Sequence, residues 1–180
     1  MPTYVALLRG INLGPRKKIA MPALRDLCEE LGHTSVTTYI QSGNVVFSSS
    51  VRSPAKVGSE LSAAIAETFG HEITVVMRTP KQLEAVVENN PFLEQGASAK
   101  ELHVAFLADK ATATLAKRLD PERAPGDAFE VRGQEIYLRY PNGMGRSKLT
   151  NDYLERRLAM ASTVRNWNTV TKLLELSRGS

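Results

Sequence analysis

Two stretches of the sequence resemble each other and divide the chain into halves. The apolar run Tyr4–Leu8 has a counterpart in His103–Leu107, and a helical pattern follows each run, with Leu115 and Leu119 in the second. Farther along each half, Ser42–Phe47 is matched by Arg132–Tyr137, and both contain a glycine turn of the kind that closes a β-hairpin. This repetition predicts a divergent internal duplication in which each half forms its own sheet.

The first half shows the order strand, helix, strand, strand, helix, strand. Apolar residues at three- and four-residue spacing predict helices over Met21–Leu31 and Pro54–Phe69. We expect the four strands at residues 3–9, 36–41, 45–47 and 73–77. The resulting βαββαβ order is that of a ferredoxin-like module.

The second half follows the same order as far as its second helix, around Tyr153–Leu158. It is then expected to close with a helix from about Asn166, where the first half closes with a strand. The predicted class is therefore α+β, with two divergent ferredoxin-like repeats (βαββαβ, then βαββα plus a C-terminal helix) and antiparallel or mixed sheets. We place the first repeat at residues 1–79, a helix and linker at 80–101 and the second repeat at 102–180, together as one compact body.

Composition excludes several classes of protein. At 180 residues the chain can bury a hydrophobic core without disulfides, and no stretch approaches the roughly 18 apolar residues of a membrane span. The N-terminus lacks the pattern of a signal peptide, so we expect a cytoplasmic protein without a membrane partner. A single cysteine, Cys28, excludes a disulfide framework, and the three histidines lack metal-ligand spacing. No metal and no cofactor are predicted.

The strongest candidate for a binding site is the loop Pro141–Leu149, which leads from a strand into a helix. Its two glycines permit backbone conformations closed to other residues, and its basic side chains and hydroxyls favour an anion at a helix N-terminus. The spacing matches neither a P-loop nor a dinucleotide fingerprint. The alternative is a plain connection in which Thr150, Asn151 or Asp152 caps the helix. The candidate ligand-binding residues in this loop are Asn142, Arg146, Ser147 and Lys148.

Further polar clusters lie at strand ends, at a hairpin turn and at the start of the last helix, where loops present side chains from a rigid scaffold. Their candidate ligand-binding residues are Arg9, Asn12, Gln41, Ser42, Asn44, Arg165, Asn166 and Asn168. Turn chemistry explains Asn44 about as well, and helix capping explains Asn166. The run Glu155–Arg157 is interpreted as a charged helix face.

Charge keeps nucleic acid as an alternative partner. The net charge is +4 and the pI is about 9.3, but only Arg16–Lys18 forms a dense basic run, which a solvated loop also explains. No stretch matches the aromatic pattern of an RNA-recognition motif, and aromatic residues make up 6% of the chain.

Four polar or strand-like segments resemble the signature segments of the domain of unknown function 1697 family. They are Val5–Asn12, Thr38–Phe47, Ser147–Leu149 and Arg165–Val170. The resemblance spans nearly the whole chain and implies an α+β fold of repeated ferredoxin-like topology in bacterial cytoplasmic proteins without an established role. The chain departs from the family pattern at Pro15 and Ala159, where glycine is usual.

The sequence is consistent with three functions. The leading hypothesis is a protein that binds a small anionic or phosphorylated ligand at the polar loops, with no assigned reaction. The alternatives are a nucleic-acid-binding protein and a structural or interaction module without a ligand. Whether the chain is an enzyme, and in which oligomeric state it exists, does not follow from the sequence.

Overall fold

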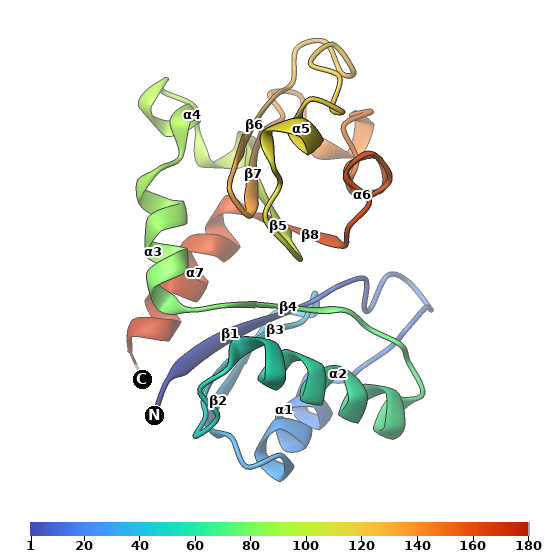
Figure 1. Cartoon of the computed structure of the whole chain (residues 1–180), viewed down its shortest axis with the longest axis vertical. Coiled ribbons are helices and arrows are strands. Elements are labelled where there is room, and N and C mark those ends of the chain that lie inside the picture. Colours follow the sequence, from blue (N-terminus) through green and yellow to red (C-terminus); the bar gives the residue numbers. More distant parts are fainter. Residues whose placement is uncertain (180) are drawn as a thin grey trace. The chain divides into compact units, whose positions relative to one another are not determined.

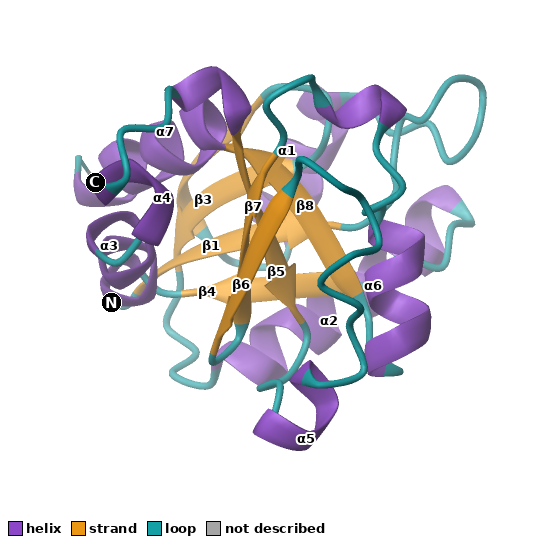
Figure 2. Cartoon of the chain, turned by 90° about the horizontal axis from the view of Figure 1, so that it is seen from above, coloured by secondary structure: helices purple, strands orange, loops and turns teal. Residues whose placement is uncertain are grey.

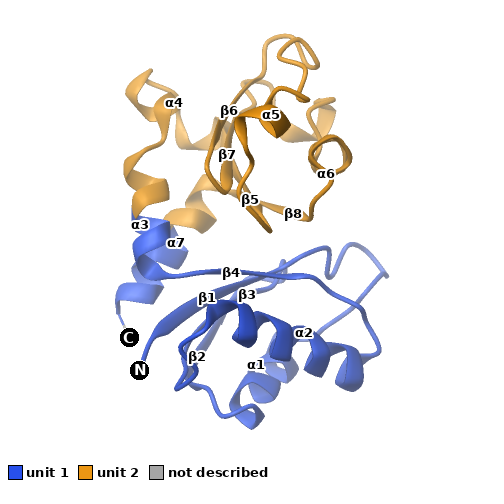
Figure 3. Cartoon of the chain, viewed as in Figure 1, with its two compact units in different colours: residues 1–84, 172–180 blue, residues 85–171 orange. Residues whose placement is uncertain are grey.

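The computed structural model describes residues 1–179 and divides into two compact units (Figure 3). Unit 1 comprises Met1–Glu84 and Lys172–Ser180, and unit 2 comprises Ala85–Thr171. Each unit contains a four-stranded sheet in which all neighbouring strands are antiparallel (orange in Figure 2), and helices accompany each sheet. The predicted α+β class is confirmed.

Unit 1 orders its sheet as β2-β3-β1-β4. The elements are β1 (Thr3–Leu8), α1 (Met21–Glu30), β2 (Thr34–Tyr39), β3 (Asn44–Ser48), α2 (Pro54–Phe69) and β4 (Val75–Arg78). Figure 1 shows α1 and α2 on one face of this sheet. Both helices match the predicted ones, because apolar side chains recur at helical spacing and pack against alternate residues of β1.

Unit 2 orders its sheet as β6-β7-β5-β8. The elements of the second half are α3 (Pro80–Glu88), α4 (Pro91–Glu94), the 3₁₀ helix η1 (Ala99–Glu101), β5 (Leu102–Leu107), α5 (Ala113–Ala116), β6 (Ala128–Arg132), β7 (Glu135–Arg139), the 3₁₀ helix η2 (Met144–Arg146), α6 (Asn151–Leu158), β8 (Ser162–Asn166) and α7 (Trp167–Arg178). The apolar side of α6 packs on β5 and β7 in the core of the unit.

The sequence predicts that the second half passes directly from α6 to the last helix, and the structure differs. Strand β8 intervenes and pairs antiparallel with β5, from His103 opposite Asn166 to Leu107 opposite Ser162. Its sequence, Ser-Thr-Val-Arg-Asn, has one apolar residue, so it carries no apolar strand pattern. The strand forms by pairing with one edge of β5 while β7 pairs with the other, and only the tertiary structure reveals this pairing.

The helix predicted around Leu115 and Leu119 is also different. Helix α5 ends at Ala116, and Leu119 is buried in the irregular segment that follows. Two prolines and a glycine in the segment before β6 oppose a longer helix. We refer to residues 117–127 as the 117–127 loop.

No helix in residues 1–179 combines the length and the apolar character that a membrane crossing requires. The cytoplasmic location expected from the sequence remains a prediction.

The C-terminus of α6 generates a prediction for stability. Ala159 ends this helix in the left-handed region with φ 55°, a conformation that costs a non-glycine residue about 1–2 kcal/mol. We expect Ala159→Gly to raise the free energy of unfolding by about 1 kcal/mol and the melting temperature by about 2–4 °C. Thermal and urea unfolding measure both quantities.

The matched control is Gly70→Ala at the end of α2. Gly70 has φ 71°, and an added Cβ meets no atom within 4 Å, so only the backbone conformation changes in energy. This variant is expected to lose about 1 kcal/mol. An Ala159→Gly variant no more stable than the parent protein would contradict the assignment of strain at this position.

Candidate functional site

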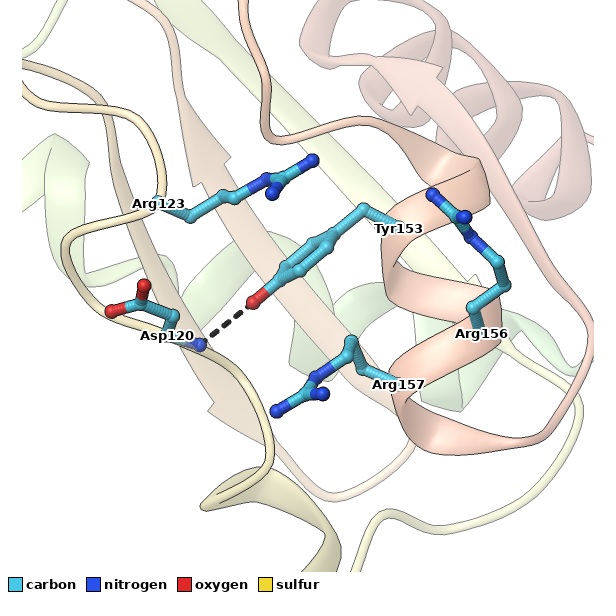
Figure 4. A pocket seen from close by; sticks show the side chains of 5 residues that line it. All are labelled: Asp120, Arg123, Tyr153, Arg156 and Arg157. Atoms are coloured by element: carbon cyan, nitrogen blue, oxygen red, sulfur yellow. Dashed lines mark hydrogen bonds between the residues drawn. The ribbon is translucent and has the colours of Figure 1, made fainter.

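A cationic pocket opens in unit 2 between the 117–127 loop and α6. It has a volume of about 520 Å³, and Figure 4 shows the five side chains that line it. They are Asp120, Arg123, Tyr153, Arg156 and Arg157.

Helix α6 presents three of these side chains on one face. Arg156 and Arg157 follow Tyr153 by three and four residues, which is the spacing of neighbours on a helix surface. The helix begins where expected, because the Thr150 hydroxyl accepts a hydrogen bond of 3.1 Å from the Tyr153 amide. The Tyr153 side chain is buried among the core residues of the unit. The helix therefore fixes one wall of the pocket.

The 117–127 loop is held against α6 through the tyrosine. The Tyr153 hydroxyl accepts a hydrogen bond of 2.8 Å from the Asp120 amide, which Figure 4 shows as a dashed line. The Arg123 guanidinium lies 4.6 Å from the centre of the Tyr153 ring, at the distance of a cation–π contact. Tyr153 thus positions both loop residues of the pocket.

Each of the three arginines is oriented by its Nε–H group. Arg123 Nε donates to the Lys148 carbonyl at 3.2 Å, Arg156 Nε to the Asp152 carbonyl at 3.4 Å, and Arg157 Nε to the Arg118 carbonyl at 2.7 Å. Within residues 1–179, the terminal amino groups of these arginines make no hydrogen bond to the protein. They remain available as hydrogen-bond donors.

The pocket carries more positive than negative charge. Three guanidinium groups, which stay protonated in proteins, face a single carboxylate, that of Asp120. The Asp120 carboxylate already accepts a hydrogen bond of 2.9 Å from the Glu122 amide. The arginines are exposed, so salt screens their attraction for an anion.

The predicted anion loop lies beside this pocket and uses part of its polar groups for its own structure. The Ser147 hydroxyl donates to Asp127 at 2.6 Å and accepts from the Leu149 amide at 2.9 Å. Arg146 and Lys148 are exposed. Only the Lys148 carbonyl takes part in the pocket's framework, through Arg123. Ligand contacts by these loop side chains remain a prediction, as they do for the exposed Asn142.

In unit 1 the structure brings several predicted residues together around Asn12. The Asn12 side chain donates to the Ile19 carbonyl at 3.0 Å and to the Gln41 carbonyl at 2.7 Å, and it accepts from the Ile19 amide at 2.9 Å. It thereby closes the loop that follows β1 and ties it to the β2–β3 turn. Arg9, at the end of β1, is half-buried and donates its amide to the Thr74 carbonyl at 3.0 Å.

The β2–β3 turn is built from the polar residues expected there. The buried Asn44 side chain donates to the Tyr39 carbonyl at 2.8 Å and to the Ser42 hydroxyl at 3.0 Å. Gly43 has φ 90°, and a Cβ at this position would lie 2.7 Å from the Ile11 side chain. The turn therefore requires glycine and binds its own polar groups.

The residues predicted near the last helix lie at the β8–α7 junction and not among the five residues of the cationic pocket. Asn166 caps α7 by accepting a hydrogen bond of 2.9 Å from the Thr169 amide. Arg165 is buried and donates to the Thr163 hydroxyl at 2.6 Å. Burial lowers the pKa of Arg165 to about 10, so the guanidinium is still charged at neutral pH. Asn168 is exposed, and its carbonyl accepts from Thr171.

Of the other groups considered in the sequence, Cys28 and His33 are buried and His103 is partly buried. Burial raises the pKa of the Cys28 thiol to about 12, so it is not a thiolate at neutral pH. Burial also lowers the pKa values of His33 and His103. In the described part of the chain, no three His, Cys, Asp or Glu side chains lie close enough together to hold a metal ion.

None of the five residues that line the cationic pocket was among the sequence-predicted site residues. Arg156 and Arg157 were interpreted as a charged helix face, and Arg123 lies in a loop about 30 residues earlier in the chain. A basic pair placed one helical turn after a tyrosine is the only sequence signal for the site, and it is shared by many solvent-exposed helices.

Comparison with known proteins supports the family and the fold. The family described as "Protein of unknown function (DUF1697)" matches residues 1–137. The chain is similar in structure to the conserved bacterial protein SP0830 from Streptococcus pneumoniae, with a TM-score of 0.76, 20% sequence identity and 98% of each chain covered. At this identity the likeness concerns the fold alone. Comparison with curated proteins gives no match. The chain belongs to the DUF1697 family of proteins of unknown function.

Proposed function

We propose that this protein binds a small phosphorylated ligand in the cationic pocket of unit 2. The observation that carries the proposal is the convergence of Arg123, Arg156 and Arg157 on one cavity, with each side chain oriented through its Nε–H group. The proposal concerns binding, and no reaction is assigned to the site.

The chemistry of guanidinium favours phosphate as the charged group. A planar guanidinium donates two parallel hydrogen bonds to phosphate oxygens, and charge-assisted bonds of this kind are about twice as strong as neutral ones. Because the Nε–H groups are already used, the pairs of terminal amino groups are available to a ligand. A volume of about 520 Å³ falls within the range of small-molecule sites.

Preorganisation supports the same conclusion. The Nε–H of Arg157 reaches across to the Arg118 carbonyl, and Arg123 is stacked over Tyr153, so both side chains have lost part of their rotational freedom before a ligand arrives. Ordering a long side chain on binding costs about 0.5–1.5 kcal/mol, and fixed side chains avoid much of this cost.

We also propose that both units are ferredoxin-like repeats that arose by duplication. Support comes from the corresponding strand orders, β2-β3-β1-β4 and β6-β7-β5-β8, and from the order βαββαβ within each unit. The cationic pocket then belongs to the repeat whose first helix is reduced to the four residues of α5.

Phosphate binding by variants of α6 tests the proposed function. Arg156 is the first choice because its Nε–H contacts only its own helix, so Arg156→Ala leaves the loop in place. Inorganic phosphate, nucleotides and sugar phosphates are first screened by thermal shift. The compound that raises the melting temperature most is then titrated by calorimetry. Losing one guanidinium–phosphate contact is expected to weaken binding about tenfold or more. Arg157→Ala is expected to weaken it at least as much.

Arg25→Ala is the matched control. Arg25 is an exposed helix arginine of α1 in unit 1 that pairs with Glu29 at 3.7 Å, so its loss changes net charge equally without touching the pocket. Its phosphate affinity should equal that of the parent protein. Absence of stabilisation by every phosphorylated compound, or equal weakening by Arg25→Ala and Arg156→Ala, would overturn the proposal.

The pH dependence of binding identifies the charged group of the ligand. A phosphomonoester loses its second proton near pH 6, whereas arginine stays charged throughout this range. Affinity for a phosphomonoester is therefore expected to be constant from pH 7 to 8 and to fall below about pH 6. Calorimetric titrations at pH 5, 6, 7 and 8 measure this change. An affinity that does not fall on acidification would be inconsistent with recognition of the dianion.

A further inference from the structure

A second cavity in unit 2 shares the 117–127 loop with the cationic pocket. It has a volume of about 590 Å³ and lies between α5, the loop and the start of β6. Apolar side chains dominate its walls, with one cation and one carboxylate among them. The lining residues are Ala116, Lys117, Leu119, Pro121, Asp127, Ala128 and Phe129.

Three consecutive residues of the 117–127 loop contribute to the lining of the two cavities. Leu119 and Pro121 line the apolar cavity, and Asp120 between them lines the cationic pocket. Consecutive Cα atoms are 3.8 Å apart, so the Cα atoms of Leu119 and Pro121 lie within about 8 Å of each other.

A second connection runs through the loop before α6. Asp127, which lines the apolar cavity, accepts a hydrogen bond of 2.6 Å from Ser147. The next residue, Lys148, accepts one of 3.2 Å from Arg123 of the cationic pocket. The linings of the two cavities are thus connected twice, once along the backbone of residues 119–121 and once through the hydrogen bonds of Ser147 and Lys148.

We infer that the ligand is an amphiphilic phosphomonoester with a short apolar arm. The inference rests on the proposed function, since the arginines hold the phosphate group. The apolar arm extends over residues 119–121 and is removed from water against Leu119, Pro121 and Phe129. Each methylene group buried in this way strengthens binding about fourfold, so the apolar cavity selects among phosphorylated compounds that the arginines alone do not distinguish.

Three probes separate the contributions of the two cavities: inorganic phosphate, hexyl phosphate and 1-hexanol. Calorimetric titration of the full chain is expected to give at least about tenfold tighter binding for hexyl phosphate than for inorganic phosphate. Binding of 1-hexanol should be far weaker than that of hexyl phosphate, because it lacks the group that the arginines bind.

Two variants of the apolar cavity test the assignment of the arm. Ala116→Leu fills the cavity from α5, and Phe129→Ala removes part of its wall. Both are expected to reduce the preference for hexyl phosphate over inorganic phosphate at least about threefold and to leave the affinity for inorganic phosphate unchanged. The control Ala113→Leu adds the same side chain to the same helix at an exposed position outside the cavity. Phe129 also packs against the core, so Phe129→Ala can fail to fold. In that case the result for Ala116→Leu alone decides the test.

The outcomes distinguish this inference from the proposed function. The inference of an amphiphilic ligand is wrong if inorganic phosphate and hexyl phosphate bind with equal affinity, or if 1-hexanol binds as tightly as hexyl phosphate. Either result leaves the proposed phosphate binding intact. If Ala113→Leu lowers the preference as much as Ala116→Leu, the apolar cavity does not hold the arm. If no phosphate compound binds, the proposed function fails and the inference fails with it.

Discussion

Each four-stranded sheet has an apolar face that must be covered, and this constraint shapes both units. In unit 1, α1 and α2 bury that face with side chains at helical spacing. In unit 2, α6 covers part of the corresponding face, but α5 is a single turn, and Leu119 and Ala124 of the 117–127 loop complete the core. Both candidate cavities lie along this loop. The cavities therefore lie where a loop, and not a helix, covers the sheet.

Much of the fold could be predicted because its elements are encoded locally. The helices Met21–Glu30 and Pro54–Phe69 follow from the spacing of apolar residues, and Ser53 and Gly70 mark the start and end of the second. The two hairpin turns could be predicted because each contains a glycine, Gly43 in one and Gly133 in the other. Strand β8 could not be predicted in this way, because Ser162–Asn166 is polar and becomes a strand only by pairing with β5. The short α5 was missed because apolar spacing continues past the residue at which the helix ends.

The candidate site was less predictable than the fold because its parts are distant in sequence. Sequence patterns identified residues such as Asn12, Asn44 and Asn166, whose side chains close loops, turns and helix ends within the protein. Polar residues at such positions serve structure as readily as function. The Arg123 and Arg157 side chains line one pocket only after the loop has folded onto α6, so no local pattern contains the pocket. Tertiary contacts through Tyr153 create it.

The anchoring of the 117–127 loop has a consequence for the energetics of recognition. The side chains of Tyr153 and Arg157 join the loop to α6, and both also line the pocket. Whenever the loop detaches, the pocket loses a wall, and Arg123 and Arg157 lose contacts that orient them. The observed dissociation constant is then the intrinsic constant divided by the fraction of molecules in which the loop is docked. Affinity in this protein can thus change through the local stability of a loop, without any change in the groups that contact the ligand.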